Sequence, residues 1–185
     1  METLLQQWTY QQMFAQLPAE SAYELIDNDL YLMPSPNSEH QGIAREISFL
    51  TISKSKQNRS GKVFFAPYDV ILDEKTVVQP DILFVGSEKE SLIGKNGFGG
   101  VPDLVVEIVS PSSVYRDHVE KKELYERFEV AEYWVIDPAN RVVEVLVLDN
   151  GKYKLNQYFY ETGIAKSLII KDFELNLEEI FKTTN

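Results

Sequence analysis

The stretch that decides the fold is PDLVVEIVSPSS, residues 102–113. In LVVEIV, five apolar residues surround a single carboxylate, that of Glu107. A continuous apolar run of this length is typical of a strand that is covered on both faces of a sheet. Charged side chains are rarely fully buried unless something pairs with them, so this glutamate requires either a counter-charge or a function.

A second carboxylate lies in a similar setting, because TVVQPDILFV (76–85) holds Asp81. If the two strands are neighbours, the carboxylates of Asp81 and Glu107 converge, and such a pair must share a proton or hold a cation. Mg²⁺ suits hard oxygen ligands and takes only one or two carboxylates besides water and phosphate. The alternative is that Asp81 ends a turn after Pro80 and Glu107 pairs with a basic side chain. The two acids together favour a functional site.

The segment RDHVEKKELYERFEV (116–130) adds a lysine. At helical spacing, Lys121 shares one stripe with Leu124, Tyr125 and Phe128, so the lysine lies on the apolar, inward face. Such a lysine snorkels or meets an anion. The alternative is an ordinary pair with Asp117, four residues earlier. Two carboxylates and a lysine around a metal form a phosphodiester-cleaving group, in which the metal activates water and the lysine stabilises developing charge.

Composition narrows the chemistry. The chain has no cysteine and two histidines, so disulfides, zinc-thiolate sites and cysteine nucleophiles are excluded. The net charge of −11 argues against tight non-specific nucleic-acid binding. One stretch, KSKQNRSGK, carries four cations and no acid, and it is either a solvated loop or a phosphate-contacting patch. Its cations are Lys54, Lys56, Arg59 and Lys62.

The N-terminus METLLQQWTYQQ lacks the positive and apolar regions of a signal peptide. No segment approaches the ~18 consecutive apolar residues that span a membrane. We therefore expect a cytoplasmic protein without a membrane segment. The length of 185 residues predicts a single domain over 1–185.

The hydrophobic periodicity predicts an α/β (α+β) domain with a mixed sheet and helices against it. An N-terminal helix and hairpin precede this core, and a hairpin with an Asp149-Asn150-Gly151 turn follows it. Ser38 and Gln41 resemble a capping box that starts the second helix. The expected helices cover 3–16, 38–54, 115–129 and 176–182, the expected hairpins 22–33 and 141–160, and the remaining strands 63–72, 77–85, 103–110 and 132–137.

On these residues the chain resembles the PD-(D/E)XK nuclease superfamily and, within it, the Uma family of restriction-endonuclease-like proteins. The resemblance covers about 20–170. It implies a restriction-endonuclease-like fold, in which a central mixed β-sheet is flanked by helices. It also implies that Asp81 and Glu107 are the motif acids and that the backbone carbonyl of Ile108 is a further metal ligand. The stretches that carry it are YELIDNDLYLMPSP, QPDILFV, PDLVVEIVSPSS, EYWVIDP and the spacing of Asp117, Lys121 and Tyr125.

The chain departs from the motif at Val109, where the family pattern has lysine. The resemblance implies that the lysine has moved to the following helix as Lys121, in agreement with the helical stripe. A literal alternative pairs Pro102-Asp103 with Glu120, but Glu120 lies on the predicted helix and not on a strand. Outer positions of the site are expected for Glu46, Asp103, Asp117 and Tyr125, whereas His40 is expected to cap or pack.

The resulting hypothesis is an endonuclease that uses Mg²⁺ (or Mn²⁺) to hydrolyse DNA. Two alternatives stay open: a catalytically silent binding or regulatory protein with the nuclease fold, and a metal-dependent hydrolase of another phosphate ester. Folds of this kind often act as dimers, so a homodimer is a further open expectation.

Overall fold

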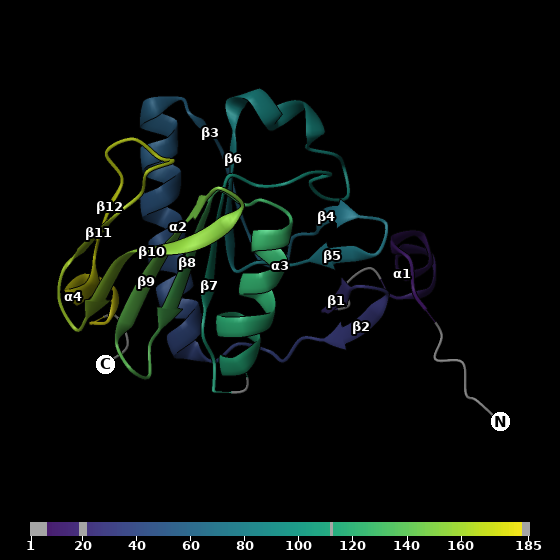
Figure 1. Ribbon diagram of the computed structural model, residues 1–185, viewed down its shortest axis with the longest axis horizontal. Coiled ribbons are helices and arrows are strands. Elements are labelled where there is room, and N and C mark those ends of the chain that lie inside the picture. Colours follow the sequence, from purple (N-terminus) through teal and green to yellow (C-terminus); the bar gives the residue numbers. More distant parts are fainter. Residues whose placement is uncertain (1–6, 19–21, 112, 183–185) are drawn as a thin grey trace.

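The computed structural model describes residues 7–18, 22–111 and 113–182. Its centre is a six-stranded sheet with the order β10-β9-β8-β7-β6-β3 (Figure 1). The pair β7–β8 is parallel and the other pairs are antiparallel, so the sheet is mixed as predicted. The strands are β3 (Gly61–Phe65), β6 (Ile82–Gly86), β7 (Leu104–Ile108), β8 (Glu132–Asp137), β9 (Val142–Asp149) and β10 (Lys152–Tyr160).

The strand β7 is buried along its whole length, as its apolar sequence predicts. Because side chains alternate along a strand, Leu104, Val106 and Ile108 pack on the face covered by α2 (Ser38–Asn58). Val105 and Val109 pack on the opposite face, against Leu124 and Tyr125. Glu107 shares this second face, and it is therefore directed toward the helix that carries Lys121.

Helix α2 is longer than predicted and starts differently. Asn37 is the N-cap, and its Oδ1 accepts a hydrogen bond from the backbone N–H of His40 at 2.8 Å. The expected capping box of Ser38 and Gln41 is therefore wrong, because the amide side chain one residue earlier satisfies the first turn. The helix ends at Arg59, which takes a left-handed conformation with φ 53°.

The predicted helix over 115–129 has two parts. A π-type turn, Arg116–Glu120, leads into α3, Lys121–Arg127. The backbone carbonyl of Asp117 accepts from the Tyr133 hydroxyl at 2.9 Å, and the Lys121 N–H bonds instead to the carbonyl of Arg116. The inward stripe is as predicted, since Lys121, Leu124 and Tyr125 are buried.

A second sheet, with the order β2-β1-β5-β4, holds the N-terminal region (Figure 1). Its strands are β1 (Tyr23–Ile26), β2 (Asp29–Leu32), β4 (Val70–Asp73) and β5 (Thr76–Val78). The expected continuous strands over 63–72 and 77–85 are therefore wrong: each divides between the two sheets. Pro67 and Pro80 lie at the divisions, where a residue without an N–H cannot continue a ladder. Helix α1 (Tyr10–Gln16) starts at a Thr9 capping box, later than expected, and the first part of the expected helix, 3–6, lies outside the described residues.

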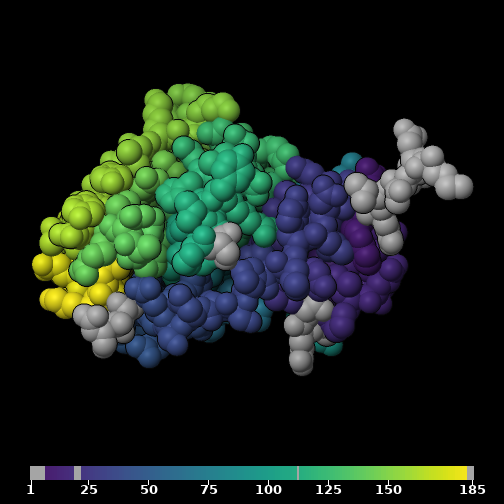
Figure 2. All heavy atoms as spheres, turned by 90° about the horizontal axis from the view of Figure 1, so that it is seen from below, coloured from purple at the N-terminus to yellow at the C-terminus, as the bar shows by residue number. Residues whose placement is uncertain are grey.

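The C-terminal part begins with the predicted hairpin, in which Asn150 and Gly151 both have positive φ. It continues as β11 (Ile164–Lys166), β12 (Glu174–Asn176) and α4 (Leu177–Ile180), which confirms the last short helix. The N-terminal region and the C-terminal segment lie at opposite ends of the molecule, with α2 and the central sheet between them (Figure 2).

Candidate active site

A cavity of about 540 Å³ lies between the N-terminal sheet, the start of α2 and the ends of β7 and the π-type turn. The structure brings the three residues singled out in the sequence, Asp81, Glu107 and Lys121, to its lining. They come from three elements: the bend before β6, the strand β7 and the first residue of α3. The lining also includes His40, Gln79, Ile108, Arg116 and Asp117.

Glu107 is 3% exposed, and both of its hydrogen bonds go to one oxygen. Its Oε1 accepts from Lys121 Nζ at 2.8 Å and from the Tyr125 hydroxyl at 2.6 Å, whereas Oε2 receives no hydrogen bond within the described residues. Burial raises the pKa of Glu107 to about 8, against the charge of Lys121, which lowers it. The carboxylates of Asp81, Asp117 and Glu24 add to the rise.

Lys121 is 1% exposed and lies between two glutamates. Its Nζ is 2.8 Å from Glu107 Oε1 and 3.2 Å from Glu24 Oε1. Burial alone lowers the pKa of a lysine, but Glu107, Glu24 and Asp117 raise this one above its ordinary value. The lysine therefore keeps its charge inside the protein.

Asp81 directs one oxygen at the backbone of β7. Its Oδ2 accepts from the Ile108 N–H at 2.7 Å and lies 3.1 Å from His40 Nε2, while Oδ1 receives no hydrogen bond in the described part of the chain. Burial lowers the pKa of His40, but the hydrogen bond to Asp81, the Asp81 charge and the Ile108 backbone raise it overall. The expectation that His40 only caps or packs therefore misses its contact with the site.

Two further site residues, Glu24 and Arg116, were missed by the sequence reasoning. Glu24 is fully buried on β1, and its Oε2 accepts from Arg116 Nη2 at 2.7 Å. Its Oε1 accepts from the Gln79 N–H at 2.9 Å and faces Lys121. The pattern YELI carries the same indication as LVVEIV, an acid inside an apolar strand, and could have identified Glu24.

The expected outer residues divide into two groups. Tyr125 contacts Glu107, and Asp117, 3% exposed, accepts from Ser113 Oγ at 2.5 Å and lines the cavity. Asp103 lies immediately before β7, at the end opposite Glu107, where it binds Lys89 Nζ at 2.5 Å and accepts from the Gly86 N–H at 2.7 Å. Glu46 is half-buried on α2 and is not part of the cavity lining.

The basic stretch does not form one patch. Lys62 lies 3.9 Å from Glu90, and Lys166, with a smaller effect of Lys54, lowers the pKa of Glu174 on β12. Lys56 and Arg59 are exposed at the end of α2 that is remote from Asp81.

Two carboxylates of the cavity could hold a cation. Among the described residues, no group of three His, Cys, Asp or Glu side chains is placed to hold a metal ion. Asp81 and Glu107 each keep one oxygen without a hydrogen-bond partner in those same residues, and both line one cavity. Mg²⁺ needs no more protein carboxylates than these, because water and phosphate complete its shell.

Comparison with known proteins identifies the family. The sequence model of the Uma2 family, described as "Putative restriction endonuclease", matches residues 9–178. The chain belongs to the Uma2 family. No curated protein matches it.

The fold of this Uma2 chain is also similar to that of a solved structure. That structure, described as a "putative nuclease belonging to DUF820 from Anabaena variabilis ATCC 29413", is 20% identical with a TM-score of 0.74, over 93% of this chain and 97% of that one. The type IIG restriction endonuclease BpuSI gives a TM-score of 0.42 at 13% identity and matches over 83% of this chain but 17% of its own. The first likeness confirms the restriction-endonuclease-like fold. None of the described helices is long and apolar enough to cross a membrane.

Proposed function

We propose that this chain is a Mg²⁺-dependent endonuclease that hydrolyses DNA phosphodiester bonds. The observation that carries the proposal is that Asp81, Glu107 and Lys121 line one cavity although they come from three separate elements. The family description, a restriction endonuclease, supports DNA as the substrate.

The residues present fit a divalent cation such as Mg²⁺ or Mn²⁺. The unpartnered oxygens of Asp81 and Glu107 would hold it, together with the backbone carbonyl of Ile108. When bound, the cation supplies charge for the phosphate and a water of lowered pKa. A bound cation would also balance the charge of the ionised acids, because four carboxyl groups surround two permanent cations: Glu24, Asp81, Glu107 and Asp117 against Arg116 and Lys121.

Lys121 would act on the phosphate or on the attacking water. An ammonium group has three N–H donors, and here one of them bonds Glu107 Oε1, while Glu24 is an ion-pair partner at 3.2 Å, which occupies at most a second donor. The third is available to a phosphate oxygen or to water, which places a fixed positive charge where negative charge develops. Glu24 would be a positioning residue, since it keeps Lys121 charged and is itself held by Arg116 at 2.7 Å.

The test is nicking of supercoiled plasmid at low salt, with Mg²⁺ or Mn²⁺ and with an EDTA control. We expect cation-dependent nicking by the wild type and its loss in Glu107→Gln, Asp81→Asn and Lys121→Ala. Lys121→Arg keeps the buried charge and serves as a second lysine variant if Lys121→Ala fails to fold. Nicking that is equal in the wild type and all variants, or absent from the wild type, contradicts the proposal.

The catalytically silent alternative has one observation in its favour. Glu107 Oε1, Lys121 and Glu24 already form a closed, buried ion-paired group, which a purely structural role would also require. Calorimetric titration with Mg²⁺ separates the two functions without relying on activity. Heat of binding that disappears in Glu107→Gln supports the enzyme, whereas no binding by a folded wild type supports the silent protein.

A further inference from the structure

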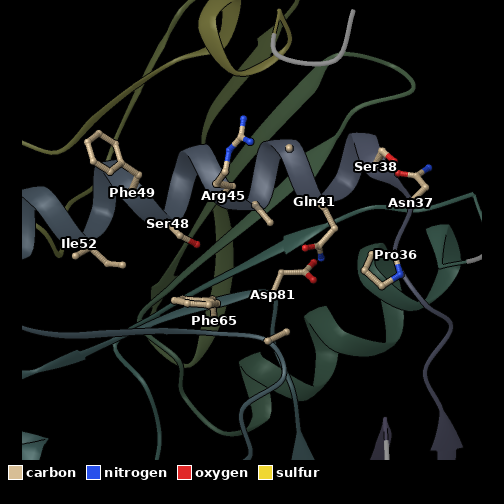
Figure 3. Close-up of a pocket in the computed structure, with 13 residues that line it drawn as sticks. Pro36, Asn37, Ser38, Gln41, Arg45, Ser48, Phe49, Ile52, Phe65 and Asp81 are labelled. Carbon is tan, nitrogen blue, oxygen red and sulfur yellow. The ribbon is translucent and has the colours of Figure 1, made fainter.

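A groove of about 820 Å³ runs along α2 and reaches Asp81, and Lys121 is not part of its lining (Figure 3). It shares Pro36, Asn37, Gln41, Ala66 and Asp81 with the cavity of the candidate site, so the two hollows are continuous. In Figure 3, α2 forms one wall, and Phe65 and Asp81 face it from the other. Nothing in the proposed hydrolysis uses this groove beyond Asp81.

Two exposed aromatic rings line the groove. Phe49 on α2 is 65% exposed, and Phe65 at the end of the edge strand β3 is 55% exposed. Exposed apolar residues are ordinary when single, but two phenylalanines on one hollow beside a candidate active site indicate a binding surface. Flat rings that are open to solvent are the feature on which nucleobases stack.

One cation, Arg45, lines this groove, and two more, Lys56 and Arg59, follow beyond its lining toward the end of α2. Arg45, Phe49, Ile52 and Lys56 follow at intervals of three or four residues and therefore share one face of α2, and Arg59 is the residue that caps the end of the helix. The acids of α2, Glu39 and Glu46, do not belong to this stripe. Arg45, Lys56 and Arg59 form no ion pair with any described residue, whereas the net charge of the chain is −11.

We propose that this groove binds an unpaired DNA strand and leads it to Asp81, an inference that rests on the proposed function. Bases would stack on Phe65 and Phe49, and phosphates would pair with Arg45 and Lys56. From Gln41 to Lys56 the helix rises about 22 Å, enough for several nucleotides. A duplex hides its base faces, so the rings would contribute nothing to it. Three cations are also too few to hold a duplex by phosphate contacts alone against the net charge.

The first experiment measures fluorescence anisotropy of a labelled oligothymidylate and of a hairpin duplex of equal length, in EDTA so that no cleavage occurs. We expect the single strand to bind at least tenfold more tightly than the duplex. Phe65→Ala and Phe65→Leu should each weaken single-strand binding about tenfold, while Phe65→Trp keeps it, because stacking needs an aromatic face. Tyr158→Ala is the matched control, since Tyr158 is 54% exposed on β10, outside the groove.

The second experiment tests the charges with a pair of variants of equal net charge. Arg45→Ala removes the cation that lines the groove, so it should weaken single-strand binding and reduce the slope of log K against log salt by about 0.7, the value for one phosphate on a single strand. Lys62→Ala removes the same charge, but Lys62 lies beside Glu90 and outside the groove, so its slope should equal that of the wild type.

Equal affinity for the duplex and the single strand, or unchanged binding by Phe65→Leu, overturns the groove proposal. Plasmid nicking by the same preparations distinguishes this failure from failure of the proposed function. If the protein nicks DNA but binds single strands independently of Phe65, the proposed nuclease function is supported and the groove proposal is contradicted. If single strands bind in a Phe65-dependent way but no nicking occurs, the groove proposal is supported and the proposed hydrolysis is contradicted.

Discussion

Glu107 on β7 and Glu132 on the neighbouring strand β8 present the same pattern in the sequence and opposite surroundings in the structure. Each is an acid in an apolar strand, LVVEI and EYWVID, and each is buried, at 3% and 0% exposure. Glu107 lies on the face of the sheet toward α3, beside Lys121 and a cavity. Glu132 lies on the other face, among the apolar residues that pack against α2 and the C-terminal segment.

The partners explain the difference. Glu132 accepts from Trp134 Nε1 at 2.6 Å and from the Leu168 N–H at 2.7 Å, so each of its oxygens accepts a hydrogen bond from a neutral group. Glu107 accepts from Lys121 and Tyr125 with one oxygen, the other has no hydrogen-bond partner among the described residues, and the residue lines the cavity. An acid inside an apolar strand thus predicts a buried polar partner. Only a cation and an open cavity beside it turn that prediction into a candidate catalytic group.

The largest expected effect separates the two acids by activity. Glu107→Gln should reduce Mg²⁺-dependent nicking by about 10³-fold, because a lost cation ligand removes several kcal/mol of transition-state stabilisation. Glu132→Gln should stay within about twofold of the wild type, measured as initial nicking rates at equal concentrations of folded protein. Equal losses of nicking rate in the two variants would contradict the prediction that the acid at the cavity is catalytic and the other acid is structural.

The second prediction concerns the free energy of unfolding, measured in urea with EDTA. The order of the variants by loss of stability differs from their order by loss of activity. Lys121→Ala should cost about 3–5 kcal/mol, because it leaves Glu24 and Glu107 buried without their shared cation. Glu132→Gln should cost about 1–3 kcal/mol, because one amide group then faces a backbone or indole N–H without an acceptor. Glu107→Gln should cost the least, since burial already favours a proton on this carboxyl. A larger cost for Glu107→Gln than for Glu132→Gln would contradict this order.

Local patterns sufficed for much of the fold. The strand over 132–137, the hairpin over 141–160 and the inward stripe of Lys121, Leu124 and Tyr125 follow from periodicity and turn residues. Asp81 and Glu107 were found because charge inside an apolar run is conspicuous wherever the strands lie. The divided strands at Pro67 and Pro80 were missed because apolar residues continue across both prolines.

The missing site residues depend on contacts between distant parts of the chain. Arg116 and Glu24 are 92 residues apart, and no local pattern places the N-terminal hairpin over the helix that carries Lys121. His40 was interpreted from its position near a helix start, which is correct but says nothing of the Asp81 side chain 41 residues later. The same limit applies to Asp103, whose strand parity with Glu107 was correct while its place at the other end of β7 was overlooked.

The smallest expected effect is in the pH dependence of stability, and it compares the two acids once more. The pKa of Glu107 is about 8 in the folded protein and near its ordinary value of 4.5 in the unfolded chain. Between these values the folded state binds more protons, so the contribution of Glu107 to stability is complete below about pH 4.5 and is lost as the pH rises to about 8. Glutamine does not titrate, and the melting temperature of Glu107→Gln should therefore rise relative to that of the wild type as the pH increases from 5 to 8.

Thermal melts in EDTA at each pH measure this difference, because a bound cation would favour the ionised carboxylate and conceal it. Burial also raises the pKa of Glu132, but hydrogen bonds from Trp134 and the Leu168 backbone lower it. The melting temperature of Glu132→Gln should consequently change with pH in the same direction and by less. If the curves of Glu107→Gln and the wild type stay parallel, the Glu107–Lys121 pair is fully ionised in the folded protein. Glu107 would then be a carboxylate that is already prepared for a cation at neutral pH, and cation binding would release no proton from it.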